Sequence, residues 1–117
     1  MNASSYDGST PLHKAVSLGL NTDIAEILLA NGADTNIQDE YGETPLHVSA
    51  FADNKSGAEL LITYGADLDK TDNKGHTALD SAIHYKNWDI ADLLKKHGAK
   101  TSKELEEVTQ ETKDSQQ

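Results

Sequence analysis

The sequence repeats itself with a period of 33 or 34 residues. One motif occurs three times, as Gly8-Ser9-Thr10-Pro11-Leu12-His13, Gly42-Glu43-Thr44-Pro45-Leu46-His47 and Gly75-His76-Thr77-Ala78-Leu79-Asp80. A Gly-Ala pair also recurs, beginning at Gly32, Gly65 and Gly98, again 33 residues apart. A fixed period in this range indicates stacked supersecondary units that bury their apolar faces on one another. Such a stack offers a continuous surface for binding another macromolecule and no enclosed pocket.

Each unit carries the signals of two short helices. A threonine in each motif (Thr10, Thr44, Thr77) occupies the position of a helix N-cap, because its hydroxyl can accept from backbone N–H groups of the first turn. The first helices are expected at residues 11–18, 45–52 and 78–86. The second helix shows apolar residues at helical spacing in 24–29 and 90–94, and a glycine suited to a left-handed backbone follows it. Turn-forming residues then fill the connection to the next unit.

These motifs resemble the ankyrin repeat, whose pattern runs G-x-T-P-L-H, a small-residue helix, a second helix ending in L-L, and G-A-D. The resemblance covers residues 5–101 and implies an all-α solenoid of three helix-turn-helix units joined by extended, β-hairpin-like loops. The expected ankyrin repeat domain is residues 1–101, with units at about 5–38, 39–71 and 72–101. Residues 102–117 are expected to form a short capping helix, because Thr101-Ser102-Lys103-Glu104 has the form of a capping box, followed by a disordered polar tail.

The units depart from one another in three places. Unit one has an extra residue between its helices, in residues 19–23, so its connection is expected to bulge. Unit two has Gly57 where the other units have isoleucine, which costs about 1 kcal/mol of helix propensity and makes this second helix a candidate soft point. Unit three has Asp80 in place of the motif histidine, and Lys100 in place of the aspartate after Gly-Ala. Terminal units of such arrays are commonly atypical.

The charge of the chain restricts its partners. The sequence has 20 acidic residues and 10 lysines, contains no arginine, and carries a formal net charge of −10. Nucleic acids and anionic membranes should therefore repel it, and a basic protein surface is the expected partner. We also expect the free chain to be a monomer. Cysteine is absent, which excludes disulfides and thiolate metal sites. With no apolar run of membrane-spanning length and no secretory signal pattern, the expected location is the cytoplasm.

Catalysis and metal binding find little support in the residues. The family resemblance implies that His13 and His47 bond to backbone in the neighbouring loop, which is a structural role. The other histidines, His76, His84 and His97, have no metal-ligand spacing. Serine and threonine residues lack a nucleophile-elbow sequence or an evident base, and the glycines form no phosphate-binding loop. The sequence thus predicts a protein that is not an enzyme and uses no cofactor and no metal.

The positions that the repeat leaves variable form the candidate binding surface. In the family these positions lie at the loop tips and on the exposed side of the first helix. Four of the six aromatic residues fall there, and aromatic side chains are favoured at binding hot spots. Trp88 begins a second helix, away from this surface, and is expected to be partly buried. The predicted protein-binding residues are Tyr6, Glu40, Tyr41, Glu43, Phe51, Lys74, His76, His84 and Tyr85.

The resulting hypothesis is a non-enzymatic module that binds one partner protein through its concave face and loop tips. Small size, strong negative charge and the absence of other domains favour an inhibitor or antidote that covers a basic enzyme. The alternative is a scaffold or adaptor that tethers a partner within a larger assembly.

Overall fold

The computed structural model describes residues 10–18 and 22–103, and these residues contain six α-helices and no β-strand. The first helices of the units are α1 (Pro11–Leu18), α3 (Pro45–Phe51) and α5 (Ala78–His84). The second helices are α2 (Thr22–Ala30), α4 (Lys55–Thr63) and α6 (Trp88–Lys96). The expected helices are confirmed to within two residues. The bulge predicted in unit one and most of the predicted capping helix lie outside the described residues.

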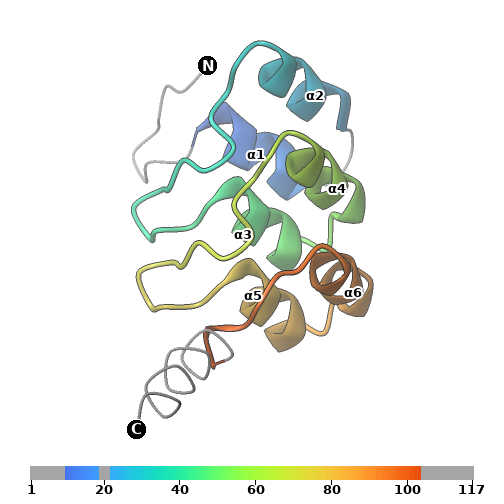
Figure 1. The fold of residues 1–117 in the computed structure, drawn as a ribbon. Coiled ribbons are helices and arrows are strands. Elements are labelled where there is room, and N and C mark those ends of the chain that lie inside the picture. The colour runs from blue at the N-terminus through green and yellow to red at the C-terminus, as the bar shows by residue number, and fades with distance from the viewer. Residues whose placement is uncertain (1–9, 19–21, 104–117) are drawn as a thin grey trace, which may run out of the picture.

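The helices form two parallel rows (Figure 1). Helix α3 packs between α1 and α5 in one row, while α4 packs between α2 and α6 in the other. Each first helix also packs against the second helix of its own unit. The loops that follow α2 and α4 project to one side of the stack, where their tips lie one above the other.

Local sequence signals set the helix ends. Thr44 and Thr77 accept hydrogen bonds from the backbone of the third helical residue, which confirms the predicted caps of α3 and α5. A left-handed glycine lies two residues after the end of each second helix; these are Gly32, Gly65 and Gly98, with φ between 86° and 93°. In each case the N–H of the following alanine donates to a carbonyl five residues back, which satisfies an otherwise orphaned helix carbonyl.

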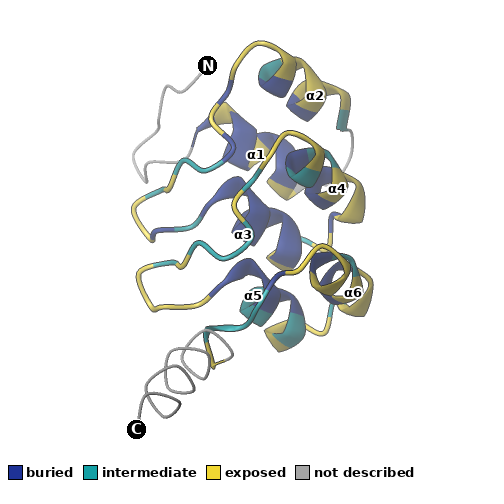
Figure 2. Cartoon of the chain, in the orientation of Figure 1, coloured by how far each residue is buried: buried dark blue, intermediate teal, exposed yellow. Residues whose placement is uncertain are grey.

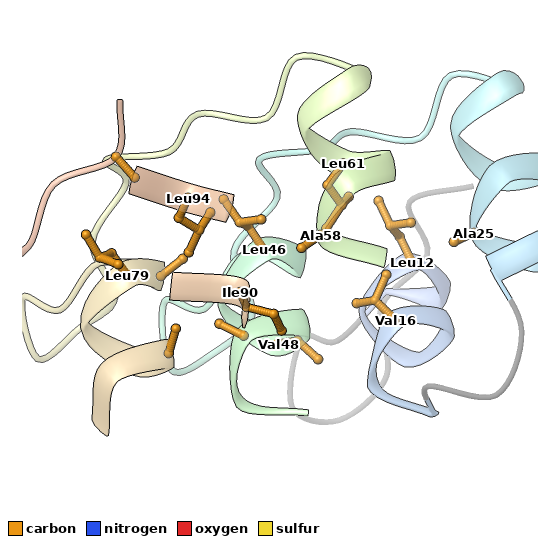
Figure 3. Close-up of a cluster of buried hydrophobic side chains, with 14 of the residues drawn as sticks. Leu12, Val16, Ala25, Leu46, Val48, Ala58, Leu61, Leu79, Ile90 and Leu94 are labelled. Atoms are coloured by element: carbon orange, nitrogen blue, oxygen red, sulfur yellow. The ribbon is translucent and has the colours of Figure 1, made fainter. Parts of the chain in front are cut away.

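The core is thin and continuous. Each unit contributes one leucine from its first helix, and Leu12, Leu46 and Leu79 are at most 1% exposed. Figure 3 shows these side chains in one cluster with Leu61, Ile90 and Leu94 from the second helices. The remaining contacts come largely from alanines, such as Ala50, Ala58 and Ala82, which are fully buried. Small side chains allow adjacent helices to approach closely. Burial is concentrated between the rows, while the loop tips and outer helix faces are exposed (Figure 2).

Candidate protein-binding face

The two described loop tips, residues 39–43 and 72–76, share one hydrogen-bonded frame. The Oδ1 atom of Asp39 accepts from the N–H groups of Tyr41 and Glu43, both at 2.9 Å. Asp72 accepts in the same way from Lys74 and His76, again at 2.9 Å. In both tips the aspartate N–H also donates to the carbonyl of the fifth residue. Each aspartate therefore satisfies two backbone N–H groups of its own tip, which gives the two tips the same backbone shape.

Histidine side chains attach each tip to the preceding unit. Thr10 N–H donates to Nδ1 of His13 (3.0 Å), so the ring proton lies on Nε2, which donates to the Glu43 carbonyl (2.8 Å). His47 repeats the arrangement with Thr44 N–H (3.2 Å) and the His76 carbonyl (2.9 Å). Both imidazoles are 2% exposed or less. The predicted structural role of these histidines is confirmed.

The network also accounts for the pKa of His47. Burial lowers this pKa from its ordinary value, and the backbone hydrogen bond to His76 and nearby carboxylates oppose the shift only in part. The neutral ring is the form that fits, because Nδ1 must accept from the Thr44 N–H. A buried, fully bonded neutral histidine is a poor candidate for catalysis here, since both nitrogens are already occupied.

Asp80 replaces the motif histidine for a chemical reason. After units one and two, the next loop offers a backbone carbonyl, so the preceding unit must supply a donor. After unit three, the chain offers the N–H of Ser102, which donates to Oδ2 of Asp80 at 3.0 Å. The same oxygen accepts from Thr77 N–H at 2.9 Å. The histidines donate to a backbone carbonyl, whereas Asp80 accepts from a backbone N–H. The residue at this position therefore matches the backbone group that it meets.

Two adjoining grooves bring most of the predicted residues together. The first groove, of about 330 Å³, lies between units one and two and is lined by Tyr41, Glu43, Val48 and Phe51. The second, of about 550 Å³, lies along unit three and shares Glu43 with the first. We define the loop-tip face by the predicted residues that line these two grooves, which are Tyr41, Glu43, Phe51, Lys74, His76, His84 and Tyr85.

The aromatic side chains of the loop-tip face are exposed and partly in contact. Tyr41, Phe51 and Tyr85 are 60%, 41% and 57% exposed, so none of them is a core residue. The Phe51 and Tyr85 rings lie 6.2 Å apart, and His84 contacts Tyr85 edge-on at 4.8 Å. Offset and edge-on ring pairs at these separations are favourable, so the cluster has a defined shape before any partner arrives.

The electrostatics of the face centre on Glu43. Burial raises the pKa of this half-buried carboxyl, and Asp39 and Asp72 raise it further. Lys74 lowers it, but its effect is the smallest of the four. The middle of the face therefore holds a partly desolvated carboxyl group with two aspartates nearby.

Some predicted residues are not placed on the face. Tyr6 lies outside the described residues. Glu40 is exposed at the first tip but lines neither groove, and its carbonyl accepts from Nδ2 of Asn73 (2.7 Å). The expectation that Trp88 is partly buried is wrong, because its side chain is 56% exposed. Trp88 stands two positions before Ile90, which turns it away from the stripe that α6 buries.

Sequence analysis missed a second set of ties between units, made by asparagines that precede the second helices. Nδ2 of Asn54 donates to the Val16 carbonyl (2.9 Å), and Nδ2 of Asn87 donates to the Ala50 carbonyl (2.6 Å). The recurrence of asparagine 33 residues apart is the signal that could have revealed them. Gly57 belongs to this arrangement, because a Cβ there would lie 2.6 Å from Nδ2 of Asn54. The glycine leaves room for an Asn54 side chain whose Oδ1 also accepts from the Gly57 N–H (3.0 Å), a capping bond that Asn87 does not make at α6.

The described part of the chain shows no group of three or more histidine, aspartate or glutamate side chains that could hold a metal ion. Among the helices at residues 10–18 and 22–103, none is long and apolar enough to cross a bilayer.

Comparison with known families agrees with the geometry. A family model described as "Ankyrin repeats (3 copies)" matches residues 12–104, which is most of the chain. The protein belongs to the ankyrin repeat family. The resemblance inferred from the motifs is thereby confirmed, together with the all-α repeat fold.

Individual relatives match only over part of their length. An ankyrin repeat-containing protein of Schizosaccharomyces pombe, P1E11.10, is 51% identical over 47 residues, covering 40% of this chain and 22% of that protein. Human Rabankyrin-5 is 51% identical over 43 residues, which are 37% of this chain and 4% of Rabankyrin-5. Neurogenic locus notch homolog protein 1 of Xenopus laevis is 42% identical over 52 residues, 44% of this chain and 2% of that protein. The chain thus spans less than a quarter of each of these relatives.

Proposed function

We propose that this protein is a non-enzymatic interaction module that binds one partner protein through the loop-tip face. Ankyrin repeats are generic protein-protein interaction modules, which sets the general class. The observation that carries the specific proposal is the exposed aromatic set, Tyr41, Phe51 and Tyr85, lining adjoining grooves on a hydrogen-bonded frame. A face that is already ordered loses little conformational entropy on binding.

The partner is expected to present a basic surface with an apolar spot. The chain carries a formal net charge of −10, and Asp39 and Asp72 each affect the pKa of Glu43 more strongly than Lys74 does. Complementary charge accelerates encounter and makes association sensitive to salt. We expect the free protein to be a monomer that forms a complex of one copy with one partner.

Alanine substitution with a matched control tests the face. The double variant Tyr41→Ala, Phe51→Ala should weaken partner capture from a source-cell lysate, measured by quantitative mass spectrometry, without lowering the melting temperature. The control is Tyr64→Ala, Trp88→Ala, which removes two aromatic side chains of similar exposure (41% and 56%) that line neither groove. Equal capture by the two double variants would contradict the proposal.

The inhibitor and the adaptor roles separate in the next step. If the protein is an inhibitor or antidote, pull-down should recover one basic enzyme in equal proportion to it. Adding the protein to that enzyme should then abolish the activity of the enzyme. An adaptor should recover an assembly of several components whose activity persists in the complex. The strong acidity favours the inhibitor, while the partial coverage of longer relatives is the specific observation that favours the adaptor.

A further inference from the structure

The first groove combines apolar walls with a carboxylate. Tyr41 and Phe51 line it together with Val48, which is 5% exposed, so one side of the groove is aromatic and aliphatic. Asp39 and Glu43 line the same groove from the first loop tip. The groove has a volume of about 330 Å³, which leaves room for a long side chain to enter from a partner.

Among the described residues that line the first groove, the carboxylates Asp39 and Glu43 outnumber the one lysine, Lys14. Burial and the like charges of Asp39 and Asp72 raise the pKa of Glu43. Lys74, at the next tip, lowers the pKa of Glu43, but its effect is smaller than that of burial or of either aspartate. A positive group placed beside Glu43 would relieve this repulsion, because opposite charge favours the ionised carboxylate.

We propose that the first groove receives an arginine side chain of the partner protein, with its guanidinium beside Glu43 and its aliphatic stem against Phe51 and Val48. This inference rests on the proposed function and names the group that the face recognises. Arginine fits better than lysine because its planar, weakly hydrated guanidinium stacks on aromatic rings and bonds a carboxylate through two N–H groups. The chain contains no arginine, so a second copy of this protein cannot supply the group.

Titration with blocked amino acids tests the groove without knowledge of the partner. The intact ¹⁵N-labelled protein is titrated with N-acetyl-arginine amide, N-acetyl-lysine amide and the neutral isostere N-acetyl-citrulline amide. Arginine should produce saturable amide shifts at Tyr41, Glu43 and Phe51. Citrulline should bind about tenfold more weakly, because it loses the charge-assisted contact. Equal binding of citrulline and arginine would overturn the charge pairing, and equal binding of lysine would overturn the guanidinium preference.

A matched pair of variants localises the effect. Glu43→Gln should weaken arginine binding about tenfold, while Glu40→Gln should leave it unchanged. Both variants remove one negative charge from the same loop tip, but only Glu43 lines the groove. Equal weakening by both would show diffuse charge attraction only and would refute the site.

The outcome also separates this inference from the proposed function. If partner capture depends on Tyr41 and Phe51 while arginine fails to bind the groove, the face is correct and the arginine assignment is wrong. If capture is insensitive to Tyr41 and Phe51 and the groove also fails to bind arginine, both proposals are wrong.

Discussion

The loop tips at residues 39–43 and 72–76 have matching backbones and different side chains. Each has an aspartate that accepts two backbone N–H groups, and each is bound by a buried histidine of the preceding unit in the same way. Yet Tyr41 is replaced by Lys74 at the equivalent position, and Glu43 is replaced by His76. Residues that build the frame therefore repeat, while residues of the proposed binding face vary. Scaffold and proposed recognition residues thus differ in how they are constrained within one tip.

The two tips differ in what covers them. Asn73 at the second tip donates its N–H to the Tyr41 carbonyl (2.9 Å) and its Nδ2 to the Glu40 carbonyl (2.7 Å). Gly42 is consequently buried, whereas its equivalent Gly75 is exposed. The first tip is held on both sides by neighbouring units, and Gly75 has nothing within 4 Å of the position where a Cβ would stand.

The largest predicted contrast between the tips comes from alanine at these two glycines. Both glycines have positive φ, 77° and 82°, so either substitution strains the backbone. At Gly42 the new Cβ would also lie 2.6 Å from the Asn73 backbone nitrogen. We expect Gly42→Ala to lower the free energy of unfolding by about 3 kcal/mol and Gly75→Ala by about 1 kcal/mol, measured by urea denaturation. Equal losses would mean that the second tip does not cover the first.

A smaller effect is expected from the aspartates that form the frame. Asp39→Ala and Asp72→Ala each remove an acceptor of two backbone hydrogen bonds, so each should lower the free energy of unfolding by about 1.5 kcal/mol. Asparagine at either position keeps an acceptor oxygen and should restore most of the loss. A clear difference in the free energy of unfolding between Asp39→Ala and Asp72→Ala would show that the two tips are not held in equivalent ways.

The pH dependence of stability tests the histidine that holds the second tip. The pKa of His47 is lowered by burial, so between the folded and unfolded values the unfolded chain binds more protons. The stabilising contribution is fully present above a pH of about 6.5 and is lost as the pH falls toward the folded pKa. NMR of the His47 ring should show the neutral form still predominant at a pH of about 6.5. A titration midpoint at or above that pH would contradict the structure.

The smallest predicted effect concerns Glu43, which gives the first tip its negative charge. Its pKa is raised in the folded protein, so its ionisation opposes folding as the pH rises above the ordinary value. Glu43→Gln should therefore stabilise the protein at neutral pH, by less than about 0.5 kcal/mol once solvent screening is included. His76→Gln, at the equivalent position of the second tip, serves as the comparison. A measurable loss of stability in Glu43→Gln would show that the carboxylate makes a favourable contact.

Much of the scaffold could be predicted from the sequence because its determinants are local. Thr44 and Thr77 cap helices through their own hydroxyls, and Gly32 and its equivalents end helices by adopting positive φ. Such effects act within a few residues, so a motif at a fixed period is sufficient to place them. The roles of His13 and His47 were also predictable, because the family resemblance implied them.

Other features depend on groups that come together only in the folded chain. The role of Gly57 is set by Asn54, whose amide binds a carbonyl 38 residues earlier. The exposure of Trp88 follows from which face of α6 is buried, and the choice of Asp80 follows from a backbone N–H at Ser102. The same holds for the candidate site. Its variable residues could be identified from the sequence, but the grooves that they line together could not.

The sequence by itself determined the repeat, the helix ends, the acidic charge and the set of variable positions, because each depends on residue type and short spacing. Tertiary structure decided which of those positions meet: it placed Tyr41, Glu43 and Phe51 around one groove and Phe51 beside Tyr85. The physical reason is that burial, desolvation of a carboxylate and contact between rings depend on distances across units. Those distances are fixed by how closely the small side chains of the core allow the helices to stack.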